Sequence, residues 1–365
     1  METTHKVLFG NAKTMKVDDN SVDLVVTSPP YPMIEMWDEQ FSNMNPQIEK
    51  ALYNSDGSLA FELMHQQLDV IWKELYRVLK EGGIACINIG DATRKVGDDF
   101  QLYSNHARVV KAFIDIGFSN MPNILWRKQT NAPNKFMGSG MMPPSAYITL
   151  EHEYVLVFRK GGKRSFSSDE KSLRRESAYF WEERNKWFSD LWEFKGILQD
   201  LADKSTRERS GAFPFELPYR FINMFSIKKD TVLDPFLGTG TTSLAALCTG
   251  RNSIGYEIEE GFRDTIFSLL NNDSINMLND RIRKRILDHK EFVKSRLAEK
   301  GDNAFKYEND HYDFPVITKQ EKPLLLNYLK TIDRESKDTV QCKYFEEAMF
   351  DYPKEGTLFA EVEHG

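Results

Sequence analysis

Short apolar runs alternate with stretches of helical periodicity along most of the chain. The runs Lys6–Phe9, Val22–Thr27 and Ile84–Ile89 predict buried strands. Apolar residues at helical spacing predict helices over Phe61–Lys80 and Ser104–Ile116. An alternation of this kind is typical of a sheet that is covered by helices.

The alternation is interrupted once and then resumes. The segment Ser165–Arg209 is polar and rich in charge, and it predicts a surface insertion that contains Trp181, Trp187 and Trp192. Further strands are predicted over Asn123–Arg127, Tyr154–Arg159, Thr231–Asp234 and Ser253–Glu257. Further helices are predicted over Phe215–Phe225, Thr241–Cys248 and Asp273–Lys300. We therefore predict an α/β protein with a doubly wound, mostly parallel sheet.

The composition narrows the class of protein. The 365 residues are 41% hydrophobic and 28% charged, which is ordinary for a globular protein with a sizeable core. No run approaches the roughly 18 apolar residues of a membrane span, and the N-terminus has no apolar signal core. The cysteines Cys86, Cys248 and Cys342 have neither metal-binding spacing nor an evident disulfide pattern. We therefore expect a cytoplasmic protein with no metal site and no contact with a membrane.

Positive charge is concentrated in the middle of the chain. The net charge is −7, which alone argues against a nucleic-acid partner. Residues 120–165, however, hold seven Lys or Arg residues against only Glu151 and Glu153. A local basic region can bind phosphates even when the whole protein is acidic. The candidate phosphate contacts are Arg127, Lys128, Lys135, Arg159, Lys163 and Arg164.

The segment Thr27–Tyr31, with the sequence TSPPY, ends a predicted strand abruptly. Proline has no backbone N–H, so Pro29 and Pro30 cannot continue a central strand. Each proline also restricts the residue before it to an extended conformation. The segment leaves Ser28 and Tyr31 at the tip of the strand. By itself the pattern fits a proline turn and an active site about equally well.

A glycine-rich turn follows the predicted strand Thr231–Asp234. Its sequence, DPFLGTGTT, leads into a predicted helix, and Gly238 and Gly240 allow the backbone to approach a ligand closely. Glu257 ends the next predicted strand, where a carboxylate can accept hydrogen bonds from ribose hydroxyls. No Lys follows the second glycine, which disfavours a loop that clamps phosphates. The combination favours a nucleoside site.

Both special segments lie at the carboxyl ends of predicted strands. In an open α/β sheet, ligands bind beyond those ends, where the strand order reverses. If the two strands are neighbours, we expect one to build the nucleoside site and the other to hold the reacting group.

With TSPPY before DPFLGTGTT, the chain resembles the DNA amino-methyltransferases that use S-adenosylmethionine, in the permuted β-type order. Further segments similar to that family follow in its order: NSVDLVVTSPPY, ELYRVLKEGG, NILWRK, HEYVLVFRK and AFPFELPYRFI. The resemblance covers roughly Lys6 to Asp264. It implies a seven-stranded Rossmann-like methyltransferase sheet with an inserted recognition region and a helical C-terminal extension.

The resemblance also assigns roles to individual residues. It implies a catalytic group made of Ser28, Pro29, Pro30 and Tyr31. It implies a site for S-adenosyl-L-methionine formed by Asn11, Phe213, Pro214, Asp234, Pro235, Phe236, Gly238, Gly240, Thr241 and Glu257. The family's Gly-Asp pair is Gly10-Asn11 in this chain, so an amide oxygen stands where the family has a carboxylate near the adenine.

The first residue of the catalytic tetrapeptide separates substrates within the family. Serine resembles the cytosine-N4 group and aspartate is usual in the adenine-N6 group, so Ser28 favours cytosine and leaves adenine as the alternative. Methylation at C5 of cytosine needs a nucleophilic Cys beside a Pro, and this chain has no such pair. The target base must leave the duplex, because its amine cannot be reached inside the stack.

The resemblance implies four parts of the chain. Residues 1–162 are the catalytic half of the methyltransferase domain, 163–209 the target-recognition region, 210–268 the cofactor-binding half, and 269–365 a mostly helical extension. The implied partner is double-stranded DNA, contacted by the six basic residues named above. In a prokaryotic cytoplasm, a cognate restriction endonuclease would act on the same site. A catalytically silent, DNA-binding relative is the alternative from a different class.

Overall fold

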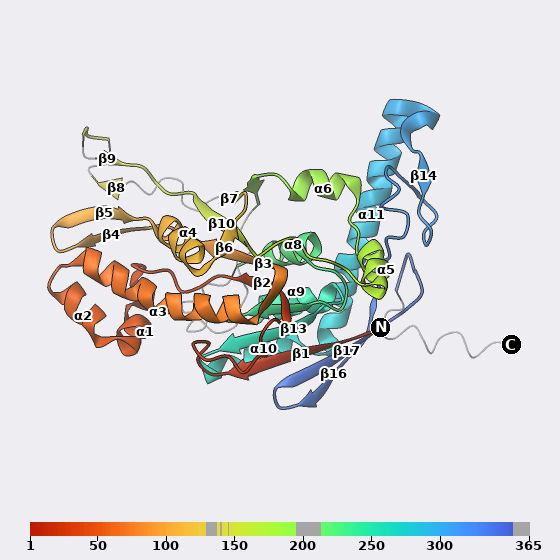
Figure 1. Cartoon of the computed structure of the whole chain (residues 1–365). Coiled ribbons are helices and arrows are strands. Elements are labelled where there is room, and N and C mark those ends of the chain that lie inside the picture. Colours follow the sequence, from red (N-terminus) through yellow and green to blue (C-terminus); the bar gives the residue numbers. More distant parts are fainter. Residues whose placement is uncertain (129–136, 139–140, 145, 195–212, 353–365) are drawn as a thin grey trace.

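A computed structural model describes residues 1–128, 137–138, 141–144, 146–194 and 213–352 of the chain. The predicted α/β class is confirmed: one large sheet runs through the molecule and helices cover it on both sides (Figure 1). In the described residues this sheet has eleven strands, in the order β11-β7-β10-β3-β2-β12-β13-β1-β17-β16, with β6 paired to β10. Two-stranded sheets form from β4 with β5, β8 with β9, and β14 with β15.

The centre of the sheet consists of five parallel strands. They are β3 (Leu79–Ile89), β2 (Val22–Thr27), β12 (Thr231–Asp234), β13 (Asn252–Glu257) and β1 (Glu2–Phe9). Beside β3, the antiparallel strand β10 (His152–Lys160) is followed by β7 (Ile124–Arg127). These seven strands correspond in number to the predicted sheet. The carboxyl ends of the five parallel strands meet at one edge, called here the carboxyl edge.

Four further strands extend this frame. At one end β11 (Leu191–Glu193) pairs with β7, and β6 (Phe118–Asn120) pairs with β10. At the other end β17 (Thr339–Tyr344) pairs antiparallel with β1, and β16 (Leu329–Ser336) pairs with β17. The sheet therefore contains the seven strands of the predicted methyltransferase sheet and four more, because outer segments of the chain also join it.

Two hydrophobic cores lie on the two faces of the sheet. All six residues of β2 are buried; Leu24 and Val26 face one core, whereas Val25 faces the other. The first core includes α8 (Glu216–Phe225), α9 (Thr241–Cys248), α10 (Arg263–Leu269) and α11 (Ile275–Lys300). The second includes α1 (Asp38–Met44), α2 (Pro46–Tyr53), α3 (Gly57–Val78) and α4 (Asn105–Ile116). Burial on both faces explains why apolar residues follow one another without alternation in β2 (VDLVVT) and at the end of β3 (IACINI).

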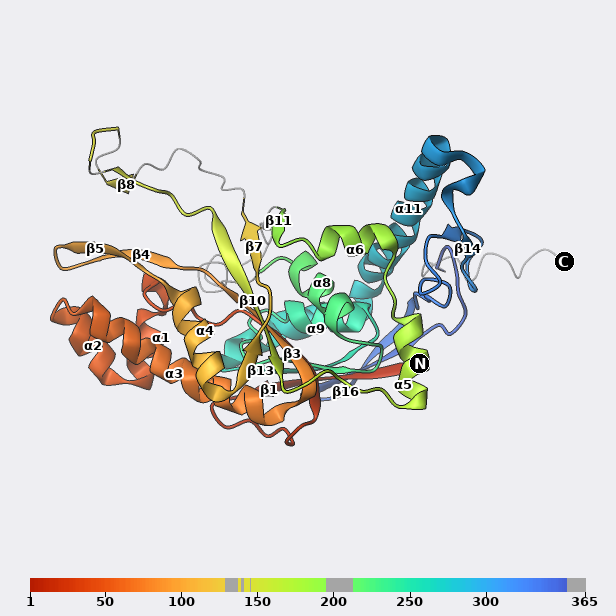
Figure 2. The ribbon, with the colours of Figure 1, turned by 45° about the horizontal axis from the view of Figure 1, so that its top comes forward.

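The remaining elements are short. They are α5 (Ser168–Glu176), α6 (Trp181–Trp187), β4 (Ala92–Val96), β5 (Asp99–Tyr103), β8 (Met137–Gly138), β9 (Ala146–Tyr147), β14 (Tyr307–Glu308), β15 (Pro315–Val316), η1 (Glu35–Trp37), η2 (Glu260–Phe262), η3 (Asn272–Ser274) and η4 (Gly301–Ala304). The hairpins β4–β5 and β8–β9 extend from one end of the molecule, and α11 rises at the other (Figure 1, Figure 2).

The C-terminal extension differs from its prediction. We expected residues 269–365 to be mostly helical, and α11 is the predicted amphipathic helix. After α11, however, the described residues form β14 to β17, with only the single turn η4. In β17 buried and less buried positions alternate, which is the pattern of a strand with one face on a core.

The tryptophans of the predicted recognition region lie mainly in the core. Trp187 and Trp192 are 4% and 2% exposed, whereas Trp181 is 37% exposed and stacks on Phe292 of α11. Arg285 of α11 forms a buried ion pair with Glu183 of α6. Trp187 and Trp192 thus anchor this segment to the main fold, while most of its described residues are exposed or half-buried, as expected of a surface segment; residues 195–209 lie outside the described residues.

No described helix combines the length and the apolar character that a membrane span requires. Within the described residues, no group of three or more His, Cys, Asp or Glu side chains is arranged to hold a metal ion. All three cysteines are buried free thiols.

Candidate active site

The two motifs meet at the carboxyl edge of the sheet. Strands β2 and β12 are neighbours, with Leu24 opposite Val232 and Val25 opposite Leu233. At their tips, the Thr27 hydroxyl donates a hydrogen bond of 2.5 Å to Oδ1 of Asp234. The two predicted strands that carry the motifs are thus neighbours, and TSPPY lies beside the glycine-rich loop.

Asp234 holds the glycine-rich loop together from inside. Its carboxylate is 1% exposed and accepts hydrogen bonds from the Thr27 and Thr242 hydroxyls and from the backbone N–H of Phe236. Burial raises the pKa of Asp234 to about 6. Because both oxygens are engaged within the protein, Asp234 shapes the loop that faces a ligand.

Two glycines give the loop its path. Gly238 and Gly240 have φ values of 55° and 92°, a left-handed conformation in which a side chain is strained. A Cβ added at Gly238 would have only the Phe236 carbonyl oxygen near it, at 4.0 Å, so the space beside Gly238 is open. At Gly240 a Cβ would come within 3.2 Å of Ile266. The loop is therefore packed on one side and accessible on the other.

Glu257 ends β13 next to this loop. Its side chain accepts hydrogen bonds of 2.8 Å from the backbone N–H groups of Gly238 and Glu259. The residue is 7% exposed, and burial raises the pKa of Glu257 to about 7. Each carboxylate oxygen keeps a further lone pair that can accept a hydrogen bond from a ligand hydroxyl.

The other predicted cofactor residues surround the same loop or begin nearby elements. Pro235 is buried, half-buried Phe236 packs edge-on against Trp72, and buried Thr241 begins α9. Phe213 and Pro214 are buried just before α8, where the Pro214 carbonyl accepts a hydrogen bond from Leu217.

Asn11 follows β1 and is exposed. Its side-chain oxygen already accepts a hydrogen bond of 2.9 Å from the backbone N–H of Lys13. Gly10, before it, donates its N–H to the Glu257 carbonyl, which keeps the tips of β1 and β13 together. Asn11 therefore lies at the correct edge, and its amide oxygen shapes the turn that follows β1.

The open space at Gly238 and the acceptor Glu257 suit the nucleoside part of S-adenosyl-L-methionine. A nucleoside needs backbone that it can approach closely and an acceptor for its ribose hydroxyls, and this loop offers both. Glu257 and the loop from Asp234 to Thr241 would hold that group.

A chain of hydrogen bonds links the residues of TSPPY to two other strands. The Ser28 hydroxyl donates to the Tyr31 hydroxyl at 3.1 Å, and Tyr31 donates to Oε2 of Glu153 at 3.0 Å. Asn88, near the end of β3, donates its amide N–H to both Tyr31 and Glu153, at 2.8 and 2.6 Å. Burial is the largest cause that raises the pKa of Tyr31 well above its ordinary value, so its phenol remains a donor.

Sequence analysis did not identify Asn88 or Glu153 as site residues. Asn88 is a polar residue within a strand whose other residues at that end are apolar, and this anomaly is a signal that pattern analysis can find. Glu153, at the start of β10, is 14% exposed and forms an ion pair with Lys128. Only the pairing of β10 with β3 reveals that Glu153 lies beside Tyr31.

The structure separates five of the six candidate phosphate contacts into two groups. Because β10 and β7 are antiparallel to each other, Arg127 and Lys128 lie at the carboxyl edge, together with the start of β10. Arg127 is 55% exposed and pairs with Glu151 and Glu193. Arg159 lies toward the opposite end of β10, followed by Lys163 and Arg164. Lys135 lies outside the described residues.

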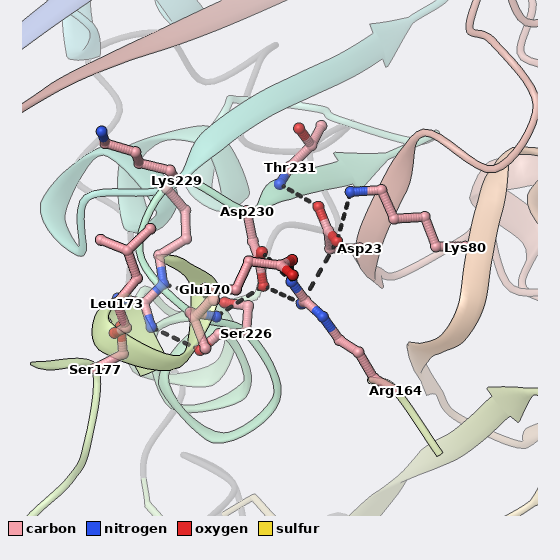
Figure 3. A network of polar contacts seen from close by, with 12 residues as sticks. Asp23, Lys80, Arg164, Glu170, Leu173, Ser177, Ser226, Lys229, Asp230 and Thr231 are labelled. Carbon is pink, nitrogen blue, oxygen red and sulfur yellow. Dashed lines mark hydrogen bonds and ion pairs between the residues drawn. The ribbon is translucent and has the colours of Figure 1, made fainter. Parts of the chain in front are cut away.

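Arg164 belongs to a buried ionic network at that opposite edge (Figure 3). Its guanidinium contacts Asp230 at 2.6 Å, Glu170 at 2.9 Å and Asp23 at 3.5 Å, and it is 17% exposed. Lys80 adds a contact of 2.8 Å to Asp23. The expectation that Arg164 contacts DNA phosphates is therefore corrected: this side chain neutralises buried carboxylates far along the sheet from TSPPY.

Comparison with known proteins identifies relatives among the DNA methyltransferases. A family model of DNA methylases, N6 and N4 methyltransferases, matches residues 22–268. The type II methyltransferase M.MthZI of Methanothermobacter thermautotrophicus is 52% identical over 335 residues, 91% of this chain and 92% of that protein. M.MjaI of Methanocaldococcus jannaschii is 51% identical over 276 residues, 72% of this chain and 90% of that protein.

Two solved structures share the fold. A DNA modification methylase candidate from Thermus thermophilus, TTHA0409 in complex with S-adenosyl-L-methionine, aligns with a TM-score of 0.54 at 29% identity, over 72% of this chain and 92% of that one. The cytosine-N4-specific PvuII DNA methyltransferase aligns with a TM-score of 0.51 at 20% identity, over 76% and 93%, which shows the fold alone. The chain belongs to the DNA methylase family. Its cofactor is S-adenosyl-L-methionine, as the family and the solved complex indicate.

Proposed function

We propose that the protein transfers the methyl group of S-adenosyl-L-methionine to the exocyclic N4 amine of a cytosine in duplex DNA, at a specific sequence. The observation that carries the choice of cytosine is Ser28, the residue at the position of TSPPY where the adenine-N6 group usually has aspartate. The order of the motifs, TSPPY before DPFLGTGTT, supports assignment to the permuted β-type group.

The chemistry requires positioning more than activation by a covalent intermediate. The amine is a weak nucleophile because its lone pair is delocalised into the ring, and bound S-adenosyl-L-methionine supplies an electrophilic methyl group. Ser28 is half-buried at the tip of β2, and its oxygen has lone pairs free for the hydrogens of the amine. Pro29 and Pro30 hold the neighbouring carbonyl groups in fixed directions. These acceptors would concentrate electron density on the nitrogen and aim it at the methyl group.

Tyr31 would contact the extruded base. Its ring is half-buried and lies close enough to Gly90 that a Cβ there would come within 2.9 Å of it. A ring held from behind by backbone and at its hydroxyl by hydrogen bonds offers a rigid face for stacking. On this proposal Tyr31 holds the base and Ser28 holds its amine.

The relatives suggest a biological setting. M.MthZI and M.MjaI are named type II methyltransferases, and this chain is about half identical to each. We propose that the protein likewise is the modification enzyme of a restriction-modification system in a prokaryotic cytoplasm. A cognate endonuclease would cut the same sequence when it is unmethylated.

The experiment is expression of the protein in a host without DNA methylation, followed by single-molecule sequencing and mass spectrometry of the nucleosides. We expect N4-methylcytosine within one short sequence motif. The Ser28→Ala variant, which should still bind S-adenosyl-L-methionine, should leave almost no marks. Detection of N6-methyladenine instead would overturn the choice of cytosine and support the alternative, an adenine-N6 methyltransferase. DNA binding by the wild type without any mark would support a catalytically silent relative.

A further inference from the structure

Glu153 is a nearly buried carboxylate at the proposed reaction site, and none of the sequence motifs assigns it a role. It stands at the start of β10, on a different part of the chain from TSPPY, and is 14% exposed. Its Oε2 accepts from Tyr31 and Asn88, and its Oε1 faces Lys128. A carboxylate that is removed from water needs such partners, and here one of them is Tyr31 of TSPPY.

The partners of Tyr31 set the direction of each hydrogen bond. Asn88 can only donate through its amide nitrogen, because a flipped amide would bring its oxygen within 2.6 Å of the Glu153 carboxylate. An ionised Glu153 can only accept, so the single phenolic proton of Tyr31 points toward Glu153. The Tyr31 oxygen is then left as an acceptor, and the Ser28 hydroxyl directs its own proton to it.

This direction has a chemical consequence for Ser28. A hydroxyl that donates to Tyr31 presents only lone pairs to any other group. A target amine carries N–H donors, so it needs an acceptor at this position and would be repelled by a hydroxyl hydrogen. The orientation of the Ser28 hydroxyl therefore depends on Glu153, which acts on it through Tyr31.

We propose that Glu153 is a positioning residue for methyl transfer, which acts through Tyr31 to hold the Ser28 oxygen as an acceptor for the amine of the target base. This inference rests on the proposed function, since it takes Ser28 to be the residue that meets the amine. Lys128 balances the charge of Glu153 from the opposite side, above the Trp126 ring at 4.6 Å. The unit thus joins β2, β3, β7 and β10 at the carboxyl edge.

The test is a double-mutant cycle on the single-turnover rate of methylation, with Glu153→Gln, Tyr31→Phe and the double variant. The substrate is a synthetic duplex that carries the sequence and base marked by the wild type. An amide in place of the carboxylate can offer N–H to Tyr31, so we expect Glu153→Gln to lower the rate about 10- to 100-fold. In the Tyr31→Phe background the same change should lower the rate less than about twofold, because no phenol remains to be oriented.

Three measurements separate positioning from a general loss of structure. Calorimetry should give the same affinity for S-adenosyl-L-methionine in Glu153→Gln and wild type, and the KM for the duplex should stay unchanged while kcat falls. Glu81→Gln, the same chemical change at an exposed position of β3, should behave as wild type. If Glu153→Gln does not fold, Glu153→Met, which is of similar length and has no acceptor for the Tyr31 hydroxyl, takes its place in the cycle.

The outcomes distinguish this inference from the proposed function. An unchanged rate in Glu153→Gln, or effects of the two substitutions that simply multiply, would overturn the role of Glu153 even if cytosine is the marked base. Adenine as the marked base would overturn the substrate choice, while a strongly coupled cycle would still support Glu153. A higher rate in Glu153→Asp than in Glu153→Gln would also support the positioning role of the carboxylate.

Discussion

Thr27 and Asp234, which are 207 residues apart in the sequence, are joined by a hydrogen bond of 2.5 Å. Each residue is the last of its strand, so the bond connects the tip of β2 to the tip of β12. The other carboxylate oxygen of Asp234 accepts from Thr242 at the start of α9. One buried carboxylate thereby fixes the distance between the catalytic segment and the glycine-rich loop.

Loss of this bond should affect both stability and cofactor binding. In Thr27→Val the buried Asp234 loses one donor, and we expect the free energy of unfolding to fall by about 1–3 kcal/mol. The affinity for S-adenosyl-L-methionine should fall as well, since the loop loses its anchor. Urea denaturation and calorimetry measure the two effects. Thr27→Ser keeps the hydroxyl and is the control; equal values for the two variants would contradict the prediction.

Cofactor binding should depend on pH through Glu257. Its ordinary pKa of 4.5 is raised to about 7 by burial, so in the free protein the carboxyl is largely protonated below pH 7. Ribose hydroxyls that donate to it favour the charged form, and the affinity should therefore fall by up to about tenfold per pH unit below 7 and level off above.

Calorimetry of S-adenosyl-L-methionine binding between pH 6 and pH 8 checks this slope. Glu257→Gln cannot ionise, so it should bind weakly at every pH and lack the slope that is due to this group. A cofactor amine that titrates in the same range contributes equally to both proteins. Identical slopes in wild type and variant would contradict the prediction that Glu257 binds the ribose hydroxyls.

The two groups of basic residues should differ in their effect on DNA binding. Arg127→Ala removes an exposed charge at the carboxyl edge, whereas Lys163→Ala removes an exposed charge near the opposite edge. If Arg127 neutralises one phosphate, the slope of log K against log salt should flatten by about 0.9 in Arg127→Ala and stay unchanged in Lys163→Ala. Fluorescence anisotropy across a series of salt concentrations measures both slopes. A larger effect of Lys163→Ala would place the duplex at the opposite edge of the sheet.

Arg164 should matter for stability and not for DNA. Arg164→Met would leave the nearly buried carboxylate of Asp230, 6% exposed, without its counter-charge, and that of Asp23, 3% exposed, with Lys80 alone. We expect the free energy of unfolding to fall by about 3–5 kcal/mol, as measured by chemical denaturation. The salt dependence of DNA binding by the folded variant should equal that of wild type. A stable variant with a flatter salt dependence would restore Arg164 to the DNA surface.

The central elements could be predicted because several local signals agree there. The strand limits Val22–Thr27 and Thr231–Asp234 and the helix Thr241–Cys248 are those of β2, β12 and α9. These strands are buried on both faces, so their centres, Leu24-Val25-Val26 and Val232-Leu233, are apolar without alternation. Pro29 follows the end of β2 after one residue and Pro235 follows β12 directly, which leaves little choice of boundary.

The outer elements and part of the site could not be predicted, for two physical reasons. In β16 all of the last four residues are exposed, so its sequence resembles that of a polar loop. Arg159, Lys163 and Arg164 are close in sequence to Glu153, but an extended strand of nine residues carries them to the other edge of the sheet. Sequence proximity cannot reveal this separation, nor the contact of Glu153 with Tyr31, because both depend on how β10 pairs.

The position of β1 between β13 and β17 has a consequence for synthesis of the protein. Strand β1 (Glu2–Phe9) is translated long before both strands that pair with it, β13 (Asn252–Glu257) and β17 (Thr339–Tyr344). At 5–20 residues per second, β1 waits on the order of half a minute with both of its edges open. Open strand edges can pair with other nascent chains. Strand β1 thus finds its partners long after it is made, and this part of the sheet is completed only once β17 has been translated.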